Sequence, residues 1–140
     1  GGQGGGEDGE RRGACVWQPL LRRLRSLRET LVSHRDFGAR AAAACELSVD
    51  VCARAGGWGW GEMLKAMAHL LGEVYPRGGG AFPREAEMHA ASAAYFACVA
   101  GDAAEFGRAL ARAQAHAHTH AHACTHGGDG MRAWAARVGA

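Results

Sequence analysis

The sequence contains few of the large side chains that fill a wide protein core. Only 7% of its 140 residues are aromatic, although 48% are hydrophobic, because alanine supplies much of the apolar count. Alanine buries little surface per residue, so a fold built from it must bring its helices close together. A chain of this length can form one domain with a modest core and is short for two.

Long apolar runs and catalytic motifs are also missing. No run of about eighteen apolar residues occurs, so we expect no membrane span. There is no nucleophile elbow, no phosphate-binding glycine loop and no close pair of carboxylates at a strand-to-helix turn. We therefore expect a protein that binds other macromolecules and needs no cofactor, rather than an enzyme.

The first residues are glycine-rich and charged, without a methionine or a signal-peptide pattern. Such an opening is typical of a fragment of a longer protein. Residues 1–13 contain no apolar side chain that could anchor them to a core. We therefore predict a disordered tail over residues 1–16.

The five cysteines are odd in number and include no CxxC pair. They are Cys15, Cys45, Cys52, Cys98 and Cys124. Most lie in alanine-rich helical segments, where a thiol behaves as a small apolar side chain. The pattern predicts reduced thiols in a nuclear or cytoplasmic protein.

A basic cluster stands out against a formal net charge of +2, which is too small to indicate nucleic-acid binding by itself. It lies in a helix that we expect to open at Pro19, and it consists of Arg22, Arg23, Arg25 and Arg28. Leucines recur on the other face at steps of four and three residues: Leu20, Leu24, Leu27 and Leu31. Either the arginines are the solvated face of a core-packing helix, or they contact RNA or an acidic partner.

An alanine-rich helix follows, with Asp36 as its expected N-cap and Gly56 as its expected end. Its packing stripe is made of small residues and one aromatic: Phe37, Ala41, Ala44, Ser48, Val51 and Ala55. Small residues on this face favour a close approach to a neighbouring helix.

A methionine-rich helix should begin near Trp60 or Glu62 and stop at Tyr75 and Pro76. Its apolar positions recur at helical spacing, which indicates core packing: Trp60, Met63, Met67, Leu70, Leu71 and Val74. The two helices form an antiparallel hairpin over residues 36–76. Trp58 and Trp60 in the turn either close the end of this hairpin or mark a surface for a partner.

A second hairpin is predicted from Pro83 to about Gln114. Its first helix packs through Met88, Ala91, Tyr95 and Val99 and closes at Gly101. Asp102 and Glu105 then form a capping box that starts its second helix. Residues 105–111 match residues 62–68 in character, an offset within the range of helical-repeat periods, so the hairpin is interpreted as an internal copy.

Alanine and histidine alternate over residues 115–126. On a helix, two pairs of imidazoles would stand four residues apart, which makes metal chelation feasible: His116 with His120, and His118 with His122. Strict alternation is also typical of low-complexity sequence, and no HExxH or paired CxxC motif frames it. The low-complexity interpretation is the stronger one, and a histidine-rich metal-binding protein is the alternative.

These elements predict an all-α protein of stacked antiparallel helical hairpins. We expect a disordered tail at 1–16, a helical-repeat domain at 17–114, a histidine and alanine low-complexity segment at 115–130, and a short C-terminal helix at 131–140.

A family resemblance adds a functional expectation. The order of eight residues resembles the helical region of the SAC-three/GANP family. These residues are Leu24, Leu27, Arg28, Leu31, Glu46, Ala55, Gly56 and Glu62. The resemblance covers about Leu20 to Arg112 and includes Ala100, Gly101, Asp102, Glu105 and Phe106 in a following helical pair. The chain departs from the pattern at Glu29 and Thr30, at Cys45 and at Gly57.

The resemblance implies a PCI-type fold of right-handed helical hairpins, similar to tetratricopeptide repeats, followed by a winged helix that is not visible after Gln114. It further implies a nuclear, non-enzymatic scaffold of an mRNA-export or RNA-processing complex. Protein subunits are the expected partners, with RNA as a second class, and the arginine cluster is the expected contact. A proteasome-lid or signalosome-type subunit is the alternative.

Overall fold

The computed structural model describes the backbone of residues 5–120 and 136–139, and the side chains of residues 16–119 and 136–139. Within these residues every regular element is a helix, which confirms the all-α prediction. The chain divides into two compact units, Gly1–Gly79 and Gly80–Ala140. The predicted repeat domain 17–114 spans both units, and the right-handed stacking of its hairpins remains a prediction.

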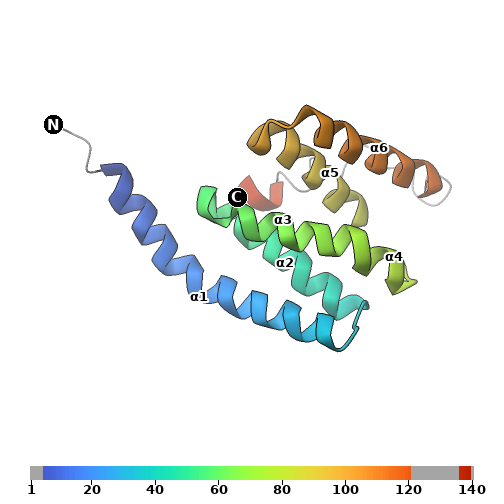
Figure 1. Cartoon of the computed structure of the whole chain (residues 1–140), viewed down its shortest axis with the longest axis horizontal. Coiled ribbons are helices and arrows are strands. Elements are labelled where there is room, and N and C mark those ends of the chain that lie inside the picture. The colour runs from blue at the N-terminus through green and yellow to red at the C-terminus, as the bar shows by residue number, and fades with distance from the viewer. Residues whose placement is uncertain (1–4, 121–135, 140) are drawn as a thin grey trace. The chain divides into compact units, whose positions relative to one another are not determined.

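The first unit contains a helical hairpin with a third helix beside it (Figure 1). Its elements are α1 (Gly5–Ser33), α2 (Ala39–Ala55), the 3-10 turn η1 (Gly57–Gly59), α3 (Trp60–His69), the π-helical turn η2 (Leu70–Val74) and α4 (Tyr75–Gly78). The helices α2 and α3 form the predicted antiparallel pair, and the second half of α1 packs against α2.

The first helix begins at Gly5, so the prediction of a disordered tail is wrong for residues 5–16. Pro19 is inside the helix rather than at its start. Its ring removes one backbone hydrogen bond, and α1 bends in its middle (Figure 1).

The buried face of α1 differs from the predicted leucine stripe. Leu21 and Leu24 are buried, whereas Leu20 and Leu27 are 38% and 47% exposed. The observed stripe continues from Leu24 to Arg28, with the same alternation of three- and four-residue steps as the predicted one. Periodicity could not choose between the two stripes, and the outcome places an arginine on the packing face of the helix.

The second helix begins at Ala39, two residues after the predicted start. Asp36 does not cap it directly, because its Oδ1 accepts a hydrogen bond from the N–H of Gly38 (2.9 Å), and Gly38 is the N-cap. The end is as predicted: Gly56 has φ of 79°, and its N–H donates to the Cys52 carbonyl (3.1 Å).

Small residues let α2 approach its partner closely, as predicted. Ala41, Ala44, Ser48 and Val51 are buried on α2. A Cβ atom on Gly59 would lie 3.0 Å from the carbonyl oxygen of Cys52 and 3.2 Å from its Cα, a closer approach than most Cβ atoms make. The facing core of α3 and η2 is formed by predicted positions: Met63, Met67, Leu70 and Val74.

The predicted stop at Tyr75 and Pro76 is wrong. The helix continues through the π-helical turn η2 into α4, whose C-cap, Gly79, has a left-handed backbone conformation. Pro76 lies in the first turn of α4, directly after the π-helical turn. Tyr75 donates from its hydroxyl to Glu46 Oε1 (2.7 Å), which ties α4 to α2.

The second unit contains the predicted second hairpin, formed by α5 (Glu85–Tyr95), the π-helical turn η3 (Phe96–Ala100) and α6 (Ala103–His120). Gly101 ends the first helix with φ of 62°, as expected. The N–H of Glu105 donates to Asp102 Oδ1 (2.9 Å), which confirms the N-cap. The reciprocal half of the capping box is replaced, because the N–H of Asp102 donates to the Phe96 carbonyl (3.0 Å).

The packing stripe of α5 holds only up to the π-helical turn. Met88 and Ala91 are buried, but Val99 is 41% exposed. A π turn contains more residues than an α turn, so positions after Tyr95 rotate away from the predicted face.

The last two predicted segments are described in part. Residues 115–120 continue α6, and residues 136–139 are helical. The remainder of both segments lies outside the described residues.

Candidate functional site

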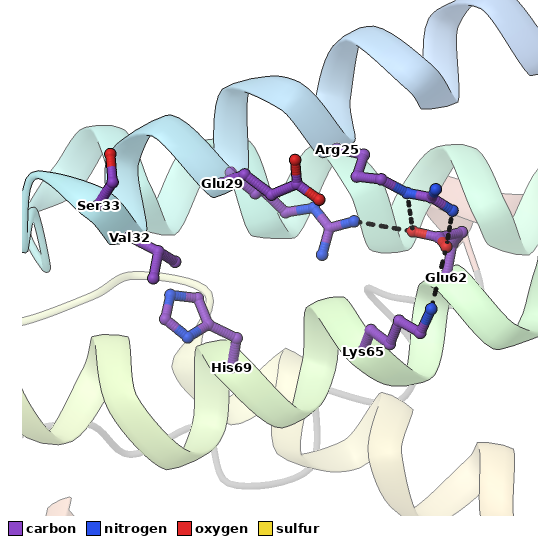
Figure 2. A pocket seen from close by; sticks show the side chains of 8 residues that line it. Arg25, Glu29, Val32, Ser33, Glu62, Lys65 and His69 are labelled. Atoms are coloured by element: carbon purple, nitrogen blue, oxygen red, sulfur yellow. Dashed lines mark hydrogen bonds and ion pairs between the residues drawn. The ribbon is translucent and has the colours of Figure 1, made fainter.

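A groove of about 400 Å³ runs between α1 and α3. One wall is formed by Arg25, Arg28, Glu29, Val32 and Ser33 of α1, and the other by Glu62, Lys65 and His69 of α3. Figure 2 shows Arg25 of α1 meeting Glu62 of α3, and Val32 of α1 facing His69 of α3. Three cationic residues and two carboxylates therefore line a single depression.

The carboxylate of Glu62 is the electrostatic centre of this groove. Arg25 donates from Nε to Glu62 Oε2 (3.3 Å) and from Nη2 to Oε1, so it binds both carboxylate oxygens. Arg28 donates from Nη2 to Oε2 (3.0 Å), and Lys65 Nζ lies 3.5 Å from Oε1. One glutamate thus holds cations from both walls, as the dashed lines in Figure 2 show.

Local sequence explains why Glu62 is placed there. The chain ends α2 at Gly56, turns through η1 and starts α3 at Trp60, so Glu62 falls in the first turn of α3. The hydrogen bond from Arg25 lowers the pKa of Glu62 more than partial burial raises it. The same pair raises the pKa of Arg25, so both groups are charged at neutral pH.

Arg28 is the most unusual residue of the groove. Its side chain is only 11% exposed, because it occupies the packing face of α1. Its Nη2 reaches Glu62, but its Nε is buried and has no hydrogen-bond partner among the described residues. Buried polar atoms are nearly always hydrogen-bonded, so this unsatisfied N–H is an exception among the described residues.

A second depression of about 320 Å³ continues the groove toward the start of α3. It shares Arg25, Glu62 and Lys65 with the first one, and it adds Arg22 and Trp58. We refer to the two depressions together as the α1–α3 groove. Trp58 is half-buried and lines the second depression.

Three of the four predicted arginines therefore meet in one place. Arg22, Arg25 and Arg28 line the α1–α3 groove, whereas Arg23 lines neither depression. They are not equivalent: Arg25 and Arg28 are held by Glu62, and Arg22 is exposed. Sequence reasoning missed Glu62 as their partner, although an acidic residue in a helix's first turn was a visible signal.

The far end of the groove carries no full charge. The imidazole of His69 has a lowered pKa, mainly because of burial, so it is neutral at neutral pH. Its ring lies 6.4 Å from that of Phe37. Val32 is 45% exposed and points toward His69 in Figure 2. The groove thus has a cationic end and an uncharged, partly apolar end.

The histidine segment has a different environment in the second unit. His116 is half-buried, and its ring centroid lies 5.1 Å from that of His89 on α5. Its Nε2 lies 3.4 Å from Glu85 Oε2. Burial, then the neighbouring His116 and Arg112, lowers the pKa of His89 to about 4. Sequence reasoning missed this contact, which makes His116 part of the α5–α6 packing.

The predicted metal pairs are only partly within the described chain. His118 is exposed, the side chain of His120 lies outside the described residues, and so does His122. Over residues 16–119 and 136–139, no three histidine, cysteine or acidic side chains converge in a way that could hold a metal ion.

Cys45 and Cys52 are free and buried, and Cys98 is free and exposed.

No helix in the described part of the chain has the length and apolar character to cross a membrane. Comparisons with protein-family models, with curated proteins and with solved structures give no match for this chain.

Proposed function

We propose that this chain is a non-enzymatic helical scaffold that binds a partner macromolecule through the α1–α3 groove. The observation that carries the proposal is the excess of positive charge in that groove, where four cationic residues meet two carboxylates: Arg22, Arg25, Arg28 and Lys65 against Glu29 and Glu62. A local excess of this kind attracts an acidic partner while the rest of the protein stays near neutrality.

The finer assignment, a nuclear subunit of an mRNA-export or RNA-processing complex, is supported by the sequence resemblance to the SAC-three/GANP family. Glu46 and Glu62, two residues of that resemblance, make contacts between helices, to Tyr75 and to Arg25 respectively. A proteasome-lid or signalosome-type subunit is the competing assignment within the same class of assembly proteins.

Affinity purification of the tagged chain from cells tests both statements. The wild-type chain should recover subunits of an export or RNA-processing complex, and lid subunits in the eluate would contradict that assignment. The double variant Arg22→Glu, Lys65→Glu reverses two exposed groove cations, and it should lose most of the recovered partners.

The matched control is Arg40→Glu, Arg112→Glu, which makes the same change in net charge at exposed positions outside the groove. It should recover partners as the wild type does. Equal recovery by the groove variant and the wild type, with helicity by circular dichroism unchanged, would remove the groove from the proposal.

A further inference from the structure

The side of α1 that is turned away from the groove carries exposed apolar side chains. Val16, Leu20 and Leu27 are 69%, 38% and 47% exposed. Each residue of an α-helix advances by about 100°, so the two leucines lie about 140–160° around the helix from Arg25, which lines the groove. We refer to Val16, Leu20, Arg23 and Leu27 together as the outer face of α1.

Arg23 lies between the two leucines of the outer face. It follows Leu20 by three residues and precedes Leu27 by four, the spacings at which side chains on a helix are neighbours. It is exposed and forms no hydrogen bond or ion pair with another described residue. The sequence places no carboxylate within one turn of it on α1. The charge of Arg23 is therefore available to a partner.

The length of the outer face suits a helix. An apolar stripe on a helix is typically covered by another helix, because its area then leaves water. The rise from Leu20 to Leu27 is about 10 Å, or two helical turns. A helix laid along α1 would meet both leucines with two side chains that stand seven residues apart.

The charge of the outer face restricts which helix can cover it. A helix that covers the two leucines also takes Arg23 partly out of water. An arginine that loses water without gaining a carboxylate costs free energy, whereas one that meets a carboxylate forms a strong, charged hydrogen bond. The covering helix therefore needs an aspartate or glutamate between its two apolar side chains.

A second copy of this chain does not supply that carboxylate. Residues 16–28 contain four arginines and no aspartate or glutamate. Two outer faces packed together would set Arg23 against apolar side chains or against another arginine, and both arrangements are unfavourable. The charge therefore favours a different protein as the occupant.

A nucleic acid matches the outer face less well than an acidic helix does. Phosphates bind to cations, and a nucleic-acid strand is held by several of them in a row. Here a single arginine stands between two exposed leucines. The leucines would gain little from a phosphate chain, and they gain most from an apolar side chain.

We propose that the outer face of α1 docks an amphipathic helix of a partner protein. Two apolar side chains of that helix, seven residues apart, cover Leu20 and Leu27, and an aspartate or glutamate between them pairs with Arg23. The outer face and the groove lie on opposite sides of α1, so each can be occupied without the other.

Selection from a phage-displayed library of helices with randomised surface positions tests this docking, with the full chain as bait. The enriched helices should carry two apolar residues seven positions apart and an acidic residue three or four positions after the first. The most enriched helix, made with a fluorescent label, gives a Kd by fluorescence anisotropy. Arg23→Glu should weaken its binding about tenfold, because it sets two carboxylates against each other.

A charge swap separates a direct ion pair from a general change of charge. When the acidic residue of the selected helix is replaced by lysine, the helix should bind the Arg23→Glu chain more tightly than the wild-type chain. Leu27→Gln should weaken the original helix severalfold, because it removes apolar contact area. Arg22→Glu, the matched control, makes the same charge change one residue away on the groove side and should leave the Kd unchanged.

Four results would overturn the docking of an acidic helix: no enriched helix, enrichment without an acidic residue, an equal loss of binding with Arg22→Glu and Arg23→Glu, or displacement of the helix by a uridine oligonucleotide. Dimerisation of the wild-type chain in analytical ultracentrifugation, abolished by Leu27→Gln, would instead make a second copy the occupant and would also overturn it. Circular dichroism should show equal helicity for all variants, since the changed side chains are exposed.

Discussion

Glu62 and Glu105 occupy matching positions in the two segments that the sequence aligns, yet they have different surroundings. Each lies in the first turn of its helix, α3 or α6. Glu105 pairs with Arg108 three residues on, and that arginine is 60% exposed. Glu62 is 16% exposed and holds cations from two helices. The difference comes from α1, which packs on the first hairpin and supplies Arg25 and Arg28.

The comparison teaches that the same local signal, an acidic first turn, can be a surface charge or the centre of a charged groove. A first-turn glutamate gains little from an exposed partner on its own helix. It gains more when a neighbouring helix buries an arginine against it, because that arginine has no other way to be neutralised.

The largest expected effect is the loss of Glu62. Glu62→Ala leaves Arg28 buried without its carboxylate, and we expect the free energy of unfolding to fall by about 3 kcal/mol. Glu105→Ala should cost far less, because its ion pair with Arg108 is exposed. Urea denaturation followed by circular dichroism measures both, and equal losses for the two variants would contradict the distinction.

Acidification should weaken the second hairpin most, through His89, while the lowered pKa of His69 acts in the same direction at the groove. Folding lowers the pKa of His89 from 6.5 to about 4, so the unfolded chain binds a proton there more readily than the folded one. The free energy of unfolding therefore decreases as pH falls from about 6.5 toward 4. Glu62 has a folded pKa below 4.5, so its contribution is lost only under more acidic conditions.

The expected loss from His89 is on the order of 1–3 kcal/mol. Hydrogen exchange of α5 and α6 at pH 7 and pH 5 should report it, with α2 and α3 changing less. His89→Leu should remove most of the pH dependence in this range. If the wild-type and His89→Leu chains show the same pH dependence of hydrogen exchange, the role of His89 is refuted.

The smallest effect concerns Gly107, which stands in α6 where the aligned position of α3 is Leu64. No atom lies within 4 Å of a Cβ placed on Gly107, and its φ is not positive. Gly107→Ala should therefore raise the stability of the second unit by about 0.5–1 kcal/mol. A rise in the thermal midpoint checks this, with Gly59→Ala as the opposite case, since its Cβ would meet the backbone of Cys52.

Much of the local structure could be predicted from spacing and caps. The methionines of α3, the glycines that end α2 and η3 and the Asp102 cap follow from short-range rules, and each is found where it was expected. The register of α1 could not be predicted, because Leu20 and Leu21 both belong to plausible stripes. The two π-helical turns gave no sequence signal, and they account for the passage of the chain through Pro76 and for the exposure of Val99.

By itself the sequence determined that the described part of the chain is helical, where several of its helices end and that four arginines cluster in one segment. Those properties depend on residues close together in the chain. Only the tertiary structure decided that Arg25 and Arg28 meet Glu62, that Arg23 does not join them and that Arg28 is buried. An ion pair between residues 28 and 62 depends on how α1 rotates as it packs, and many side-chain contacts along two helices fix that rotation together.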